Sequence, residues 1–164
     1  MQSFPSITTM SYRVTGLKAA PFVHLYGLTD AALRELGVQR VVADARPGYP
    51  DRIEMRDAEV GEKLLLLNQV CQPADTPYRA SHAIFIREGA LEPYDRVGEI
   101  PEVMRGRLLS LRAYDGKGQM LDADVVEGRD CEALIHRLFA KPEVAYIHAH
   151  NARRGCYAGR IDRV

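Results

Sequence analysis

The stretch LLSLRAYDGKGQMLDADVV at residues 108–126 decides the fold class of this chain. It predicts two strands, at 108–114 and 119–126, because both segments are rich in apolar and β-branched residues. The four residues between them, 115–118, include an aspartate and two glycines, a composition typical of a tight β-hairpin turn. We therefore expect an antiparallel pair of strands here.

Helices are predicted before and after this hairpin in the sequence. They do not alternate regularly with the predicted strands. Thr29 is a good N-cap for a short helix that ends at Gly37, and Asp130 begins a longer one that stops before Pro142. Pro101 to Arg105 is expected to form a single helical turn. Further strands are predicted at 12–17, 38–43, 63–68, 82–87, 144–150 and 157–163. Strands with two principal helices predict an α+β fold with a mainly antiparallel sheet, in which 63–68 and 82–87 are central strands.

The length of 164 residues suits one domain. Hydrophobic residues make up 46% of the chain and charged residues 27%, a globular balance that excludes a disordered or collagen-like chain. The start, MQSFPSITTM, precedes the first strand pattern. We therefore expect a disordered extension at 1–9 and a single compact α+β domain at 10–164.

Charge and cysteine content bear on partners and location. The 22 basic and 22 acidic side chains cancel, so no global field attracts nucleic acid or an anionic membrane. No apolar run approaches the ~18 residues that cross a bilayer. The start lacks the features of a signal peptide, and Cys71, Cys131 and Cys156 are odd in number and widely spaced. These features favour a soluble cytoplasmic protein with free thiols, without a nucleic-acid or membrane partner.

The richest chemistry lies near the end, in HAHNARRGCY at residues 148–157. Residues two apart on a strand share a face, so the imidazoles of His148 and His150 should project side by side. Gly155 permits a tight return that brings Cys156 back toward them. His82, at the start of another strand, is expected to approach from the middle of the chain. Three hypotheses follow from this grouping.

The first hypothesis is a metal site. His148 and His150 would share a divalent cation such as zinc, with His82 as the third ligand and Cys156 or Asp44 as further candidates.

The second hypothesis is a thiol-dependent enzyme. Cys156 would be the nucleophile, with Arg153 and Arg154 favouring its thiolate. His148 or His150 would act as the base, oriented by Asn151 or by an acidic residue.

The third hypothesis, which we favour, is a pocket that binds a small anionic ligand. Arginine and histidine side chains offer donors to a carboxylate or phosphate, and a tyrosine hydroxyl adds another. The expected ligand-binding residues are His82, His150, Arg79, Arg153 and Tyr157, together with His148. The alternatives are the small metal- or thiol-dependent enzyme and a protein-interaction module without a pocket. No pattern indicates an oligomeric state.

Several segments together resemble a known family. They are RVVAD at 40–44, PGYP at 47–50, QPADTPYR at 72–79, SHAIF at 81–85, DADVV at 122–126, and HAHNAR at 148–153 with GCY at 155–157. In this order they resemble the bacterial family known as domain of unknown function 1203, over nearly the whole chain. The resemblance implies a bacterial, soluble, single-domain protein. It assigns no activity and no site residue.

Overall fold

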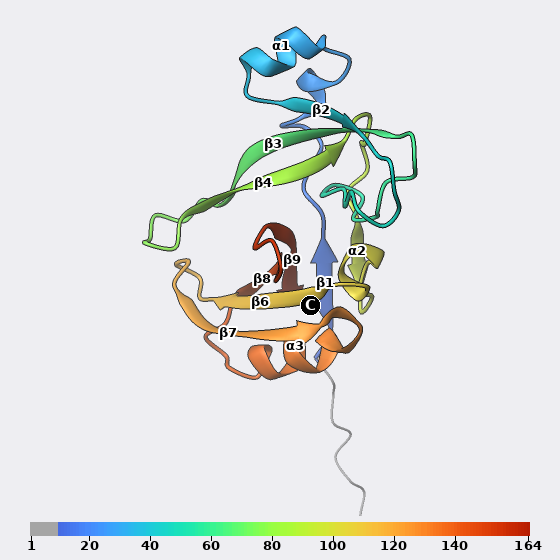
Figure 1. Cartoon of the computed structure of the whole chain (residues 1–164). Coiled ribbons are helices and arrows are strands. Elements are labelled where there is room, and N and C mark those ends of the chain that lie inside the picture. Colours follow the sequence, from blue (N-terminus) through green and yellow to red (C-terminus); the bar gives the residue numbers. More distant parts are fainter. Residues whose placement is uncertain (1–9) are drawn as a thin grey trace, which may run out of the picture.

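Two antiparallel sheets and three α-helices make up the part of the chain that the computed structural model describes, residues 10–164 (Figure 1). The α+β class and the mainly antiparallel pairing predicted from the sequence are confirmed, as is the single compact domain. The expected extension at 1–9 lies outside the described residues. No helix within 10–164 is both long and apolar enough to cross a membrane.

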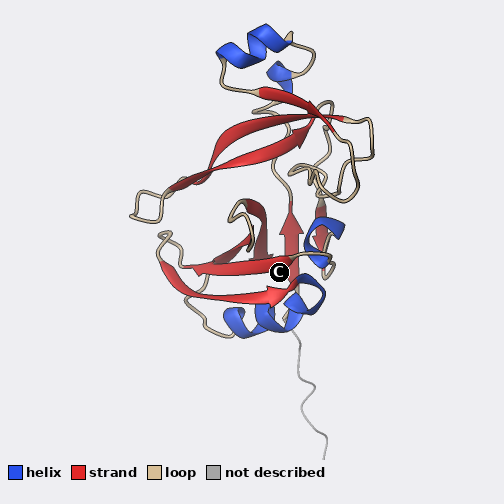
Figure 2. Ribbon diagram, viewed as in Figure 1, coloured by secondary structure: helices blue, strands red, loops and turns tan. Residues whose placement is uncertain are grey.

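The larger sheet has six strands in the order β5-β1-β9-β8-β6-β7. Its strands are β1 (Tyr12–Thr15), β5 (Asp95–Val97), β6 (Leu108–Tyr114), β7 (Met120–Glu127), β8 (Tyr146–Asn151) and β9 (Tyr157–Arg163). Helix α3 (Cys131–Phe139) covers one face of this sheet (Figure 2). Its apolar side chains, such as Ile135 and Leu138, pack in one core with Leu111 and Ile147 of the sheet. The opposite face of β8 therefore carries the two histidines.

The smaller sheet has three strands in the order β2-β3-β4: β2 (Gln39–Val42), β3 (Lys63–Gln72) and β4 (Ala80–Arg87). The 3₁₀ helix η1 (Val23–Leu25) and helix α1 (Asp30–Glu35) supply residues to its core, among them Leu25 and Leu33. Thr29 caps α1 as predicted, since its side chain accepts a hydrogen bond from the amide of Ala32 at 3.2 Å.

Strand β4 corrects one expectation. The sequence predicted a central strand at 82–87, but β4 is the last strand of the smaller sheet. Among the strands of residues 10–164 it pairs with β3 alone, and its other edge forms an isolated parallel bridge between Phe85 and Asp51. Its apolar run reflects coverage of both faces: Ile84 and Ile86 belong to one core, and Phe85 packs against another. An edge strand that is covered on both faces has the same composition as a central one.

Strand β3 is also longer than the strand predicted at 63–68, because Gln69 to Gln72 continue it. They pair with β4 through a β-bulge between Val70 and Gln72. The far end of the β3–β4 hairpin thus reaches the larger sheet, where Gln72 Nε2 donates to the hydroxyl of Tyr146 at 3.0 Å. This contact holds the two sheets together at the end where β4 carries His82.

The segment 50–55 passes between the two sheets. Leu17 N donates to the carbonyl of Arg52 at 2.8 Å, and a Cβ on Gly16 would lie 2.0 Å from the carbonyl oxygen of Ile53. Only glycine permits so close an approach. The short elements α2 (Glu102–Arg105) and η2 (Gly128–Asp130) pack against each other, and Gly128 N donates to the carbonyl of Arg107 at 2.8 Å.

Candidate functional site

The histidines from the middle and the end of the chain are neighbours. The ring centroids of His82 and His150 are 5.0 Å apart, and those of His148 and His150 are 6.5 Å apart. Both histidines of β8 project from the face opposite α3, as the alternation along a strand predicts. The geometric expectation that these imidazoles converge is therefore confirmed.

Two of these histidines are buried and uncharged. His148 and His150 are each 3% exposed. Burial lowers the pKa of His148 to about 3 and that of His150 to about 4, with nearby positive charges adding to the effect. Their surroundings are aromatic and polar: Tyr157 lies edge-on to His148 at 5.1 Å, and Gly155 O lies 3.0 Å from His150 Nδ1. Both imidazoles are therefore neutral at pH 7 and are not the cations of an anion site.

A cleft of about 680 Å³ opens beside His82, whereas His148 and His150 are not among its lining residues. Four parts of the chain form its walls: the β3–β4 hairpin with the segment before it, the turn between α2 and β6 with the start of β6, the end of β7, and the β8–β9 loop. Apolar side chains on the first wall include Pro50, Leu66 and Phe85, while the β8–β9 loop supplies Arg153 and Arg154. One side of the cleft is thus apolar and another is cationic.

Arg52 lies at the inner end of the cationic side and is the central residue of the site. It is 2% exposed, yet it lines the cleft. Its guanidinium donates to the carbonyls of Tyr157 at 2.8 Å and Pro50 at 2.5 Å, and to the sulfur of Cys156 at 3.2 Å. Within residues 10–164, no carboxylate forms an ion pair with it. Burying a cation without an anionic partner reduces the free energy of folding that the protein gains. The same burial lowers the pKa of Arg52.

Sequence reasoning missed Arg52. It follows Pro50 and Asp51 in a segment without apolar periodicity, so nothing in the sequence marks it as buried. The burial comes from the crossing of segment 50–55 between the two sheets, a tertiary feature.

Cys156 also lines the cleft, and its sulfur accepts from two N–H donors. One is Arg52, and the other is Asn151 Nδ2 at 3.4 Å. Backbone bonds between Asn151 and Cys156, and between Gly155 and Asn151, close the β8–β9 loop and fix the thiol in place. Neither His148 nor His150 forms a hydrogen bond to this sulfur in the described part of the chain, so the expected imidazole base is not in contact with it.

The other expected site residues divide into three groups. His82 and Arg153 line the cleft. Tyr157 is buried beside His148 and His150, beneath the cleft wall. Arg79 lies on the exposed turn at the tip of the hairpin, where its guanidinium donates to the carbonyl of Pro73 at 2.6 Å. Arg79 therefore does not line the cleft, because the extra length of β3 places the turn beyond it.

The zinc hypothesis receives no support from the geometry. In the described range 10–164, no group of three His, Cys, Asp or Glu side chains is arranged to hold a metal ion. The rings of His82 and His150 pack edge to face, and those of His148 and His150 are tilted, and among residues 10–164 no carboxylate completes a ligand set with them.

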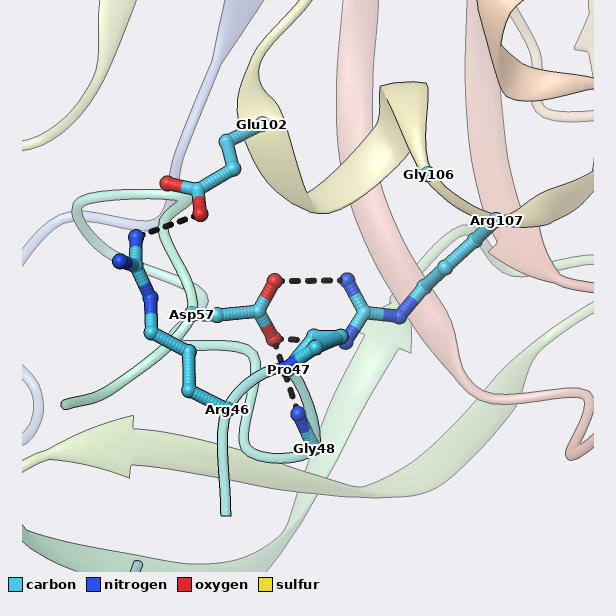
Figure 3. A pocket seen from close by; sticks show the side chains of 7 residues that line it. All are labelled: Arg46, Pro47, Gly48, Asp57, Glu102, Gly106 and Arg107. Carbon is cyan, nitrogen blue, oxygen red and sulfur yellow. Dashed lines mark hydrogen bonds and ion pairs between the residues drawn. The ribbon is translucent and has the colours of Figure 1, made fainter. Parts of the chain in front are cut away.

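A second hollow of about 450 Å³ adjoins the cleft and shares Arg107 with it. Figure 3 shows that its cations are neutralised by carboxylates. Arg46 Nη2 lies 2.6 Å from Glu102, and Arg107 contacts both oxygens of Asp57, at 2.6 and 3.1 Å. Because these charges are already paired, this hollow is a poorer anion site than the cleft lined by Arg52.

Comparison with known proteins adds a family but no activity. A family model described as protein of unknown function (DUF1203) matches residues 48–163. This range includes both Arg52 and Cys156 and every wall of the cleft. No curated protein and no solved structure matches the chain.

Proposed function

The chain belongs to the DUF1203 family of proteins of unknown function, and we propose that it binds a small anionic ligand in the cleft between its two sheets. The observation that carries this proposal is Arg52, a buried residue of the cleft lining whose guanidinium has no carboxylate partner among residues 10–164. An incoming carboxylate or phosphate would supply the missing negative charge.

Further cations support the same conclusion. Arg153 and Arg154 are exposed on the β8–β9 loop, line the cleft and form no ion pair with another described residue. Arg112 projects from β6 beside the histidines, contributes to the low pKa of His82, and likewise has no acidic partner in the described range. Glu127 is a carboxylate on the cleft wall, at the exposed end of β7. The positive charges thus outnumber the negative ones where a ligand would enter.

Calorimetric titration with inorganic phosphate at pH 7 tests the proposal. The wild-type protein should bind, and the double variant Arg153→Gln, Arg154→Gln should bind at least about tenfold more weakly, because two charge-assisted contacts are lost. Arg46→Gln is the matched control, since it removes a cation that Glu102 already neutralises. Failure of phosphate to bind the wild type, or equal affinities for all three proteins, would overturn the proposal.

A second candidate function is a thiol-dependent reaction at Cys156. The observation that favours it is the position of the sulfur on the cleft wall, where it accepts hydrogen bonds from Arg52 and Asn151. A ligand bound by Arg52 would lie next to this nucleophile. The reactivity of the thiol therefore separates a binding protein from an enzyme.

We also propose that the protein is bacterial and cytoplasmic and that it does not bind nucleic acid. The zero net charge supports the last point, because binding to nucleic acid depends on an excess of basic side chains. The absence of a disulfide framework in the cysteine spacing supports a reducing compartment.

A further inference from the structure

The cleft has an apolar wall that an inorganic anion would not use. Leu66 and Phe85 face each other across β3 and β4, and both are partly exposed. Phe85 also packs against Tyr49, with ring centroids 5.3 Å apart, which fixes its orientation. Pro50 and Ala83 extend the same wall. These side chains offer a preformed apolar surface.

This apolar wall begins next to the cationic end of the cleft. The amide of Arg52 donates to the carbonyl of Phe85 at 3.2 Å, so the two residues are adjacent across a backbone contact. Leu66 lies directly beyond Phe85 on β3. A ligand whose anionic group lies beside Arg52 would therefore place whatever is attached to that group along Phe85 and Leu66.

The volume of the cleft agrees with a ligand larger than an oxyanion. At about 680 Å³, it lies within the range of roughly 300–1,000 Å³ for pockets that enclose whole small organic molecules. Such pockets combine an apolar lining with a few charged groups that orient the ligand. The observed division into an apolar and a cationic side has this character.

We propose that the ligand is either an organic carboxylate or a phosphate monoester, in both cases with an apolar body. Its anionic group would lie beside Arg52, and its apolar body would lie against Leu66 and Phe85. This inference rests on the proposed anion-binding function and adds the chemical class of the ligand. The apolar wall contributes affinity through burial of the body, and the arginines fix its orientation.

Calorimetric titration with phenyl phosphate and with inorganic phosphate tests this inference. Wild-type protein should bind phenyl phosphate at least about tenfold more tightly, because part of the ring leaves water. Leu66→Asn should remove most of that gain while leaving the affinity for inorganic phosphate unchanged. Leu36→Asn is the matched control, since Leu36 is an exposed leucine at the end of α1, outside the cleft walls. If Leu66→Asn does not fold, Phe85→Val takes its place.

The outcomes are distinguishable. Equal affinities of the wild type for the two compounds would overturn the inference and leave the anion site in place. A gain that persists in both the Leu66 and the Phe85 variants would also overturn it, because the ring would then lie elsewhere. Failure of both compounds to bind would overturn the proposed function as well.

Discussion

Arg52 and Cys156 are 104 residues apart in the chain, yet the Nη2 of Arg52 lies 3.2 Å from the Sγ of Cys156. One residue lies in the segment that crosses between the sheets, and the other in the β8–β9 loop. The contact therefore joins the two halves of the fold at the inner end of the cleft. It also brings a permanent positive charge to a thiol.

Arg52 should contribute to stability as well as to binding. The substitution Arg52→Lys keeps the charge, but one nitrogen cannot replace the three donors to Pro50, Tyr157 and Cys156. We expect the free energy of unfolding, measured by urea denaturation, to fall by roughly 2–4 kcal/mol. Arg46→Lys, at an exposed ion pair, should change it by less than about 1 kcal/mol. Equal effects of the two substitutions would contradict the structural role of Arg52.

Cys156 should be the most reactive of the three cysteines. Its sulfur lines the cleft and is held by two N–H donors, whereas burial raises the pKa of both Cys71 and Cys131 to about 11. Labelling with iodoacetamide at pH 7, read by peptide mass spectrometry, should modify Cys156 first. Asn151→Ala should slow this labelling by removing one donor. Preferential labelling of Cys71, or an unchanged rate in the Asn151 variant, would count against the reactive-thiol candidate.

Stability should depend on pH through the buried histidines. Their folded-state pKa values, about 3 for His148 and about 4 for His150, lie below the unfolded value of 6.5. As pH falls, the unfolded chain is therefore protonated first, so these groups leave stability unaffected well above pH 6.5 and reduce it below. Each imidazole contributes a slope that approaches about 1.4 kcal/mol per pH unit.

The substitution His148→Phe isolates this effect, because a phenyl ring suits the surrounding tyrosines and takes up no proton. Urea denaturation between pH 5 and 8 should give a shallower loss of stability for this variant than for the wild type. His24→Asn, at an exposed position, should keep the wild-type slope. A His148→Phe slope equal to that of the wild type would show that the histidine does not titrate as described.

Gly16 should tolerate no side chain. A Cβ there would lie 2.0 Å from the carbonyl oxygen of Ile53 and 2.9 Å from that of Arg52, and both are backbone atoms with little freedom to move. We expect Gly16→Ala to lower the free energy of unfolding by more than about 2 kcal/mol. Gly116→Ala, whose Cβ would meet no atom within 4 Å, is the control. A thermal melt that places both variants near the wild type would contradict the close approach.

Local patterns predicted much of the fold. The hairpin at 108–126, the cap at Thr29 and the shared face of His148 and His150 all depend on neighbours in the sequence, so they could be read from it. The convergence of His82 with His150 was a further expectation, and it holds because the long β3–β4 arm reaches across to the larger sheet.

Features that depend on tertiary packing could not be predicted in this way. The division into two sheets, the edge position of β4 and the burial of Arg52 all follow from how distant segments pack. Periodicity reports which faces of a strand are covered but not whether its edges are paired. For the same reason the sequence could not show where Arg79 lies, on the hairpin turn beyond the cleft lining.

The most direct test of the anion site is to locate a bound anion. A crystal soaked in selenate, at a concentration near the dissociation constant measured for phosphate, should give an anomalous difference peak beside the Arg52 guanidinium, between Cys156 and the β8–β9 loop. The same soak of the Arg153→Gln, Arg154→Gln variant should give a weaker peak there. Selenate found only at surface arginines outside the cleft, with none beside Arg52, would contradict the account.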